Sequence, residues 1–426
     1  MPQEELKAQA PDPNYKNSWY AVTPNRLLVT LGSLKGEINC DVCVIGAGFT
    51  GISAAFELVQ KGYSVTLLEG KNIIDSATAH NSSHLLRGYH HSPGYLSQKY
   101  SPAGAKMLCN MTLEGLALIV ERIAKHDIKC DLKFGHLTAA LNNHDATSLK
   151  QRMAEWGKLG HTDLKYIPKK EIHKYVDSAK YIGGLFDPKG AHFHPINYAM
   201  GVLQTAQNSG CKIYDETQVT SITQGNTVRI QTKNGAVNAK FVILSGFVRI
   251  PGLSILNKKI FAASVPMIAT QPLPDRVSHK ISPRNYAIVD SCRIMNYFKF
   301  SSDNRLLFGS AGQGINLRQR MTALFPDLKD AKIAHEWSNH MDFTLNAMPN
   351  MGRYSANIFY AQGYCGQGVI LGNLAGKLIA EVVSGTTERF DIFAKIGHMS
   401  IPAGDTLKQR ILALGMAWYR LQDSLL

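Results

Sequence analysis

After an N-terminal arm of residues 1–38, the pattern of apolar and polar residues predicts a strand–helix–strand unit. Residues 41–45 form a short apolar run, residues 52–60 carry apolar side chains at helical spacing, and residues 63–69 form a second apolar run. Runs of this length and periodicity are typical of buried strands and an amphipathic helix. The unit has the scale of a βαβ motif, in which two parallel strands flank one crossover helix.

The remaining pattern predicts further helices and many short strands. Helical spacing covers residues 102–130, 145–159, 197–209 and 368–383. Apolar alternation predicts strands at residues 211–214, 219–223, 228–232, 241–244, 265–271, 286–289, 294–300, 305–308 and 358–361. The Asn234-Gly235 pair predicts a hairpin turn. Residues 183–195, rich in Gly, Pro and His, are predicted to form a loop or a short strand.

The order of these elements predicts an α/β fold with an interruption. The βαβ start is followed by mixed elements, then by strands expected to form a mainly antiparallel sheet, and finally by a strand and a helix of the first kind. Alternating strands and helices build parallel sheets covered by helices, whereas consecutive strands pair antiparallel. We therefore expect a nucleotide-binding domain interleaved with an α+β substrate domain.

A glycine-rich turn follows the first predicted strand. Gly46, Gly48 and Gly51 form the pattern G-x-G-x-x-G at the start of the helix, and Glu69 ends the second strand. The glycines permit a tight turn, close approach of a pyrophosphate and close packing of helix on strand, and the acidic residue can accept hydrogen bonds from a ribose. The context predicts a dinucleotide site, although the motif alone does not choose between NAD and FAD.

Composition narrows the classes of protein. The net charge of +14 is spread along the chain, which favours a basic globular protein over a nucleic-acid binder. Seven scattered cysteines predict free thiols in a reducing compartment, so we expect a cytoplasmic protein. There is no cluster of residues at metal-ligand spacing, and no apolar run long enough to span a membrane.

Short motifs along most of the chain resemble one enzyme family, the FAD-dependent amine and amino-acid oxidases that include glycine oxidase and sarcosine oxidase. The motifs that carry this resemblance are SWYAVT, CDVCVIGAGFTG, LLEG, GAHFHPINYA, VILSG, NYFKFSSDNRLLFG, AMPNMGR and YAQGYCGQGV. The family implies a Rossmann-type FAD-binding domain, with a substrate domain whose antiparallel sheet roofs the flavin.

The resemblance assigns roles to segments and residues. It divides the chain into the arm (1–38), three parts of the FAD-binding domain (39–100, 186–250 and 346–390), a helical substrate region (101–185), an antiparallel sheet (251–345) and a C-terminal tail (391–426). The residues it implies for FAD binding are Gly46, Gly48, Phe49, Thr50, Gly51, Glu69, Gly70, Ala77, Thr78, His80, Asn81, Ser82, Ser83, Val219, Ser245, Gly246, Gly363, Gly366, Gln367, Gly368 and Val369.

One segment departs from the family pattern. Relatives carry a segment of the type A-S-G-R-N-G-G beneath the flavin, whereas residues 77–83 read Ala-Thr-Ala-His-Asn-Ser-Ser, with serines in place of glycines. Serine hydroxyls can still bond phosphate or ribityl oxygens. His80 has two interpretations, a noncovalent contact with the cofactor or a covalent link to the flavin, and the sequence leaves both open.

The family reaction is hydride transfer from a carbon bearing an amine to the flavin, and hydrolysis of the imine to an aldehyde and ammonia. The resemblance implies a primary or secondary amine of the gamma-glutamylputrescine kind, with oxygen as acceptor. His84 could take a proton from the amine, Tyr297 could shape the pocket, and Arg353 could pair with a substrate carboxylate. A surface or structural histidine, a core tyrosine and a structural ion pair are the corresponding alternatives.

Two other functions stay open at this point: a related dehydrogenase that uses another electron acceptor, and a flavoprotein homologue without catalysis. The C-terminal residues 407–426 are predicted to form an amphipathic helix. We expect that helix to dock on the body or on a partner subunit rather than on a membrane surface. The pattern gives no oligomeric state.

Overall fold

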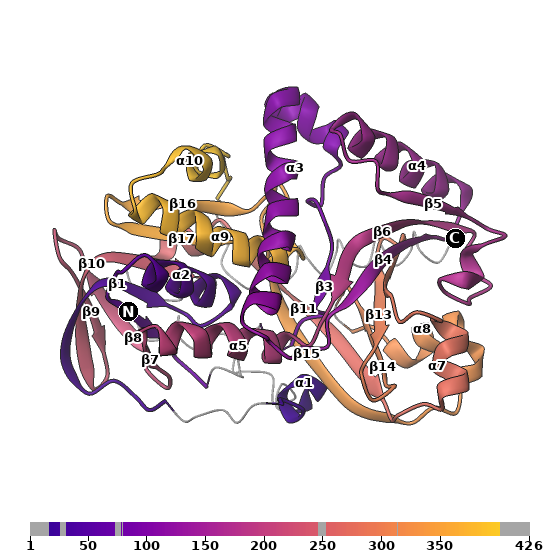
Figure 1. The fold of residues 1–426 in the computed structure, drawn as a ribbon, viewed down its shortest axis with the longest axis horizontal. Coiled ribbons are helices and arrows are strands. Elements are labelled where there is room, and N and C mark those ends of the chain that lie inside the picture. Colours follow the sequence, from indigo (N-terminus) through magenta and orange to yellow (C-terminus); the bar gives the residue numbers. More distant parts are fainter. Residues whose placement is uncertain are drawn as a thin grey trace.

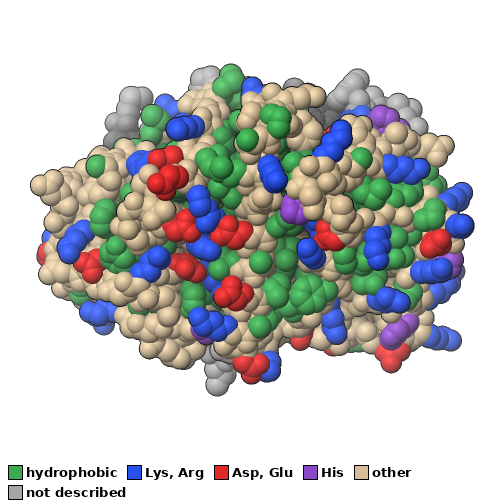
Figure 2. Space-filling view, turned by 45° about the horizontal axis from the view of Figure 1, so that its top comes forward, with side chains coloured by type: hydrophobic (Ala, Val, Ile, Leu, Met, Phe, Trp, Pro, Cys, Tyr) green, Lys and Arg blue, Asp and Glu red, His purple; other side chains and the backbone are tan. Residues whose placement is uncertain are grey.

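The computed structural model describes residues 17–25, 31–72, 78, 80–245, 253–312 and 314–400. Two residues predicted to bind the cofactor, Ala77 and Gly246, lie outside these residues, as does the helix predicted at the C-terminus. Figure 1 shows two sheets side by side, with the long helix α3 standing between them. Figure 2 shows Lys and Arg side chains spread over the visible face rather than gathered in one patch.

The first sheet contains the predicted βαβ unit. Its order is β16-β17-β10-β1-β2-β7, with β8 and β9 attached beside β10. The neighbours from β17 to β7 run parallel, whereas β16 and the β8–β9 hairpin run antiparallel. The strands are β1 (Gly36–Ile45), β2 (Val65–Leu68), β7 (Lys212–Tyr214), β8 (Val219–Thr223), β9 (Val228–Thr232), β10 (Gly235–Ser245), β16 (Asn350–Ser355) and β17 (Ile358–Gln362).

The second sheet is the roof sheet, and it is mainly antiparallel as predicted. Its order is β15-β11-β14-β13-β12-β4-β6-β3, with β5 beside β6, and only the β12–β4 pair among these strands is parallel. The strands are β3 (His84–Leu85), β4 (Lys133–Ala140), β5 (Lys165–Pro168), β6 (Gly183–His192), β11 (Phe261–Thr270), β12 (Ala287–Asp290), β13 (Asn296–Phe300), β14 (Leu306–Ser310) and β15 (Ile333–Phe343).

Helices cover both sheets. In Figure 1, α2, α5 and α9 lie against the first sheet, and α7 and α8 lie against the roof sheet. The helices are α1 (Trp19–Val22), α2 (Phe49–Gln60), α3 (Pro93–Lys125), α4 (Asn143–Lys158), η5 (Ile172–Lys174), α5 (Pro195–Asn208), α6 (Ser254–Asn257), α7 (Asp275–Ile281), α8 (Leu317–Leu324), η6 (Pro326–Leu328), α9 (Gly368–Val383) and α10 (Glu388–Ala394).

The two faces of the roof sheet carry different clusters. On one face, Phe298 and Phe300 of β13 join an apolar core with α8. On the other face, Tyr297 packs with Trp19 and Tyr20 of the N-terminal arm. These two aromatic residues anchor the arm on the body of the protein, since they are 4% and 0% exposed. We call the face that carries Tyr297 the inner face.

The prediction for residues 183–195 is wrong in its main part, because β6 is a strand of ten residues. Its glycines, which favoured a loop, instead allow β4 to lie close. A Cβ on Gly190 would lie 2.5 Å from the Cβ of His136, and a Cβ on Gly184 would lie 2.9 Å from the backbone oxygen of Thr138. The composition therefore reflects close strand packing rather than a turn.

One described helix is long and apolar enough to cross a membrane by length and composition, namely α3. It is interrupted by non-helical backbone at Tyr100 and Ser101, just before Pro102. Ala105, Leu116 and other buried positions of α3 belong to the main apolar core. In its apolar stretch 44% of the residues are buried inside the described protein, so packing accounts for part of its apolar character.

Helices α2 and α9 approach each other so closely that a glycine is required between them. A Cβ on Gly376 would lie 2.5 Å from the backbone oxygen of Thr50 and 2.6 Å from the backbone nitrogen of Ala54. We expect Gly376→Ala to lower the free energy of unfolding by about 1–3 kcal/mol, because the added methyl must push the two backbones apart. Urea unfolding measures this change.

The matched control is Gly157→Ala in α4, where an added Cβ has no heavy atom of the described part of the chain within 4 Å. We expect this variant to be more stable than the wild type by about 0.5–1 kcal/mol, because alanine loses less backbone entropy than glycine in a helix. A Gly376→Ala variant as stable as the wild type would contradict the close packing of α2 on α9.

Candidate active site

The turn between β1 and α2 is closed by backbone contacts that leave no room for side chains. Gly46 has a φ of +100°, and a Cβ there would lie 2.7 Å from the backbone oxygen of Ser245. A Cβ on Gly51 would lie 1.9 Å from the backbone oxygen of Gly46. The Ser245 hydroxyl donates to the backbone oxygens of Ile45 and Gly46, each at 2.8 Å. The end of β10 is thereby joined to the glycine turn.

Helix α2 begins at this turn and offers its N-terminus to a ligand. Gly48 is the N-cap and provides no capping side chain. Among the atoms of the described residues, a Cβ on Gly48 would have only the Thr78 hydroxyl oxygen within 4 Å, at 3.6 Å. That hydroxyl accepts a hydrogen bond from the Phe49 N–H at 3.2 Å. Since a helix N-terminus has free donors and a partial positive charge, this end of α2 suits a phosphate.

Glu69 lies at the same edge of the first sheet, directly after β2. Its carboxylate accepts hydrogen bonds from the N–H of Ala47 at 2.8 Å and from the N–H of Lys71 at 3.0 Å. Burial raises the pKa of this carboxyl, and the backbone donors partly offset the effect. The two donors fix the carboxylate beside the glycine turn, where it can accept hydrogen bonds from ribose hydroxyls.

A second glycine turn joins β17 to α9. Gly363 and Gly366 have φ values of +71° and +87°, which glycine adopts without strain. Between them, the Tyr364 hydroxyl lies 2.6 Å from the Thr50 hydroxyl of α2. The structure therefore brings the two predicted glycine turns together, although they are more than 300 residues apart in sequence.

The other predicted cofactor residues lie around these two turns. Gln367 is the N-cap of α9, Gly368 is its first residue, and Val369 is buried in the first turn. Gly70 follows Glu69, and a Cβ there would meet the side chain of Gln218, the neighbour of Val219. Val219 is the buried first residue of β8.

The segment that departs from the family pattern is held by its own side chains. The Asn81 amide donates to the backbone oxygen of Thr78 at 2.6 Å, and the Asn81 carbonyl accepts from the Ser83 N–H at 2.7 Å. Ser83 has a φ of +56°, in the region that glycine favours. The chain therefore keeps a glycine-like backbone with a serine, at a cost of about 1–2 kcal/mol. The partly buried Ser82 precedes it, and the His80 backbone oxygen accepts from Trp337 Nε1 at 3.1 Å.

His84 and Tyr297 come together on the inner face of the roof sheet. Their ring centroids are 6.2 Å apart, and His84 pairs with His192 in the β3–β6 register. Burial, with smaller contributions from His136 and Lys299, lowers the pKa of His84 well below its ordinary value. The half-buried ring is therefore neutral near pH 7, and its unprotonated nitrogen can accept a hydrogen bond.

Lys299 completes this group, although it is not among the site residues predicted from the sequence. Its Nζ donates to the Ser83 hydroxyl at 2.5 Å and to the backbone oxygen of Phe193 at 2.7 Å. The Tyr20 hydroxyl lies 3.2 Å from the same Ser83 oxygen. The alternation of residues 296–300 could have indicated this position. In a strand every second side chain lies on the same face, so Lys299 lies on the face of Tyr297.

The structure does not bring Arg353 together with His84 and Tyr297. Its guanidinium donates to the Asp391 carboxylate and lies over the ring of Phe390, with 5.4 Å to the centroid. Of the two roles considered for Arg353, these contacts correspond to the structural ion pair, which holds α10 against β16. Asp391 is acidic and adjacent, so no substrate carboxylate is needed to balance the charge of Arg353.

The sequence matches a family of known proteins over most of its length. The family model for FAD-dependent oxidoreductases of the DAO type matches residues 41–382. The chain belongs to this family. Its sequence is 34% identical to gamma-glutamylputrescine oxidoreductase of Escherichia coli over 424 residues, which cover 96% of this chain and 99% of that protein. It is also 34% identical to a probable oxidoreductase, OrdL, of Haemophilus influenzae, over 90% of this chain and 92% of that protein.

Solved structures of the DAO family share the fold. The crystal structure of glycine oxidase from Geobacillus kaustophilus matches with a TM-score of 0.69 at 20% sequence identity, covering 85% of this chain and all of that one. The protein is therefore an FAD-dependent oxidoreductase, and the predicted recognition, fold class and cofactor are confirmed.

The residues of the DAO-family site fit FAD. The cradle at Gly46, Gly48 and Gly51 is one that added side chains would fill, and Glu69 is placed for a ribose. The N-terminus of α9, joined to the cradle through Tyr364 and Thr50, offers a second positive helix end. Among the described residues there is no group of three or more His, Cys, Asp or Glu side chains that could hold a metal ion.

Lys299 should make stability depend on pH. Burial lowers its pKa from 10.5 to about 7, so above pH 7 the unfolded chain binds one more proton at this site than the folded chain does. The free energy of unfolding therefore rises with pH at this site, by at most about 1.4 kcal/mol per unit, between pH 7 and 10.5. We expect Lys299→Met to remove this rise.

The measurement is urea unfolding of both proteins from pH 7 to 8.5. The difference between the two proteins cancels the other titrating groups. Parallel stability curves for the wild type and Lys299→Met would show that Lys299 keeps an ordinary pKa in the folded protein.

Proposed function

We propose that the protein oxidises a primary or secondary amine of the gamma-glutamylputrescine kind, yielding an imine that hydrolyses to an aldehyde, with release of ammonia from a primary amine or of a smaller amine from a secondary one. The observation that carries this proposal is the similarity, over 96% of this chain and 99% of the relative, to the Escherichia coli oxidoreductase named for that amine. The geometry of the roof sheet supports it, because His84 and Tyr297 lie together beside the segment predicted to contact the flavin.

His84 is proposed to prepare the amine. An ammonium group cannot release a hydride from its neighbouring carbon readily, so the substrate must lose a proton first. The half-buried imidazole is neutral because of its lowered pKa, and it can take that proton at a ring nitrogen. The buried ring of Tyr297 beside it excludes water and offers an aromatic surface to the amine.

Bound FAD supplies the hydride acceptor, and most of the redox chemistry belongs to it. The protein itself holds the reactive carbon in a fixed position between the roof sheet and the segment around Ser83. Ser83 is fixed in turn by Asn81 and Lys299. These contacts support a role of the Thr78–Ser83 segment in orienting the cofactor, with serines in place of the glycines of relatives.

We propose molecular oxygen as the electron acceptor and the cytoplasm as the location. The location is supported by the seven cysteines, all of which are free thiols in the structure. Neither nucleic acid nor a metal ion has a part in this proposal.

The proposed reaction can be tested by mixing the FAD-loaded protein with gamma-glutamylputrescine without oxygen. We expect the flavin absorbance to bleach, and air to restore it with formation of hydrogen peroxide. His84→Gln should slow the bleaching by about 100-fold or more, because positioned acid–base groups contribute about 10²–10⁴ in rate. The rate of flavin reduction measures this directly.

His144→Gln is the matched control, since His144 is an exposed histidine on α4. It should leave the rate unchanged. If bleaching occurs without peroxide on admission of air, the protein is a dehydrogenase that uses another acceptor. If no amine bleaches the flavin, the protein is a flavoprotein without this catalysis.

A further inference from the structure

The N-terminal arm contacts the segment that is proposed to orient the flavin, although the arm lies outside the part of the chain that matches the family. The family match begins at residue 41, whereas Trp19 and Tyr20 of α1 are buried against the inner face of the roof sheet. The Tyr20 hydroxyl lies 3.2 Å from the Ser83 hydroxyl. The family match therefore assigns no role to this contact.

The Ser83 hydroxyl has a partner for each of its hydrogen-bonding positions. It donates its proton to the backbone oxygen of Ser82 at 2.6 Å, and it accepts from Lys299 Nζ at 2.5 Å. A serine hydroxyl has one donor and two acceptor positions, so the second acceptor position is left for Tyr20. The Tyr20 hydroxyl is then the donor of this contact. Burial raises the pKa of Tyr20, which keeps its proton in place near neutral pH.

The ring of Tyr20 is held by several neighbours. Its centroid lies 5.2 Å from that of His194 and 5.9 Å from that of Trp337, both in edge-to-face geometry. Lys299 Nζ lies 5.3 Å from the same centroid, a distance at which a cation and an aromatic ring attract each other. Trp337 also donates from Nε1 to the backbone oxygen of His80 at 3.1 Å. The ring cluster thus contacts residues 80–83 at both ends.

The start of α5 fixes the arm. The Thr23 hydroxyl donates to the backbone oxygen of Trp19 at 2.5 Å and lies 3.2 Å from His194 Nε2. The Asn25 N–H donates to the side-chain oxygen of Asn197 at 3.0 Å. The tyrosine hydroxyl of the arm therefore has a fixed position.

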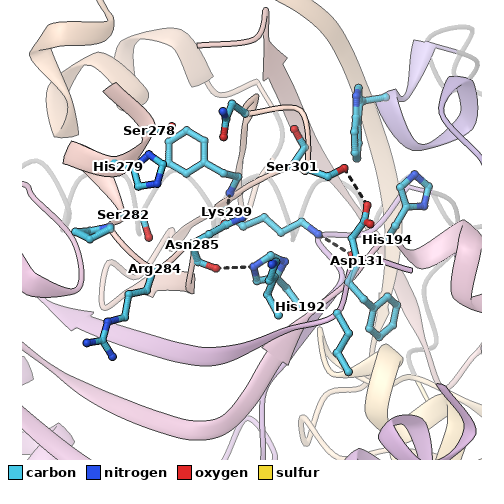
Figure 3. Close-up of a pocket in the computed structure, with 18 residues that line it drawn as sticks. Asp131, His192, His194, Ser278, His279, Ser282, Arg284, Asn285, Lys299 and Ser301 are labelled. Carbon is cyan, nitrogen blue, oxygen red and sulfur yellow. Dashed lines mark hydrogen bonds between the residues drawn. The ribbon is translucent and has the colours of Figure 1, made fainter. Parts of the chain in front are cut away.

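Lys299 reaches the same serine from a cavity at the end of the roof sheet. The cavity has a volume of about 500 Å³, and Figure 3 shows Lys299 extending across it toward Asp131 and His194. Burial lowers the pKa of Lys299, and Asp131 acts as a counter-charge that partly offsets this effect. Lys299 therefore holds Ser83 without a ligand in the cavity.

Ser83 depends on these contacts because its backbone has an unusual conformation. Its φ of +56° lies in the region that glycine favours, and the Ser83 N–H donates to the Asn81 side-chain oxygen at 2.7 Å. Hydrogen bonds to the serine hydroxyl favour this conformation over the ordinary one. A glycine would adopt the same backbone without them.

We propose that Tyr20 is a positioning residue of the cofactor site. Through its hydrogen bond to Ser83, the N-terminal arm holds the backbone of Ser82 and Ser83 in the conformation that binds FAD. The inference rests on the proposed role of the Thr78–Ser83 segment in orienting the cofactor, and it adds the arm to that site.

The test is a double-mutant cycle in which FAD affinity of the full-length protein is measured by fluorescence titration. We expect Tyr20→Phe to weaken FAD binding by about 3- to 10-fold, because the loss of one hydrogen bond between neutral groups lowers the population of the binding conformation by that factor. In the Ser83→Gly background, Tyr20→Phe should change the affinity by less than about 2-fold, since glycine has no hydroxyl for Tyr20 to hold.

Tyr181→Phe is the matched control, because Tyr181 is also buried and its hydroxyl donates to Asp290 in the other core of the roof sheet. It should leave FAD affinity unchanged in both backgrounds. Visible circular dichroism of the FAD-loaded protein is the second readout, because it reports how firmly the flavin ring is oriented. We expect Tyr20→Phe to lower the visible ellipticity and Tyr181→Phe to preserve it.

Urea unfolding shows whether the variants are folded. If Tyr20→Phe is not, Thr23→Val carries the same test, because it removes the hydroxyl contact of the arm with His194 and keeps the tyrosine. Ser83→Val tests the segment independently of the arm. A β-branched residue is strained at this φ, so this variant should weaken FAD binding at least as much as Tyr20→Phe does.

Equal effects of Tyr20→Phe in the wild-type and Ser83→Gly backgrounds, or no effect in the wild type, would overturn the positioning role. If Ser83→Val changes neither FAD affinity nor the visible ellipticity, the proposed role of the segment fails and this inference fails with it. If no amine reduces the flavin but the cycle behaves as expected, the proposed reaction is wrong and the role of Tyr20 stands.

Discussion

The contact among β1, β10 and α2 is the constraint on which the rest of the site depends. A methyl group at Gly51 would lie 1.9 Å from the backbone oxygen of Gly46, and a methyl group at Gly46 would meet Ser245. Because these glycines have no Cβ, the Ser245 hydroxyl can bridge the end of β1 to the end of β10. The N-terminus of α2 is then fixed at the edge of the sheet where a dinucleotide binds.

The same constraint extends to the second glycine turn. Gly376 lets α9 lie directly on α2, and the Tyr364–Thr50 hydroxyl contact joins the two helix starts. Two positive helix ends thus face one region, which we propose holds FAD. The roof sheet is tied to that region by Lys299, whose amine is bonded to Ser83 of the segment beneath it. Cofactor cradle and substrate side are therefore parts of one connected structure.

Local pattern was sufficient for the elements but not for their long-range contacts. The βαβ unit, the glycine turn and Glu69 could be predicted because each depends on residues close together in sequence. The long strand β6 could not, because its glycines record the proximity of β4 rather than a turn. The role of Lys299 could not be predicted because it depends on a hydrogen bond with Ser83, which is 216 residues away in sequence. The choice between the two roles considered for Arg353 likewise could not be made from the sequence, because only the fold places Asp391 beside it.

A crystal structure of the FAD-loaded protein tests the central claim most directly, namely that the glycine cradle and the Lys299 face of the roof sheet belong to one active site. The account predicts the pyrophosphate at the N-terminus of α2, and the flavin ring against the Ser82–Ser83 segment with His84 and Tyr297 on its substrate side. A flavin ring separated from Ser83 by other side chains, or directed away from the inner face of the roof sheet, would contradict it.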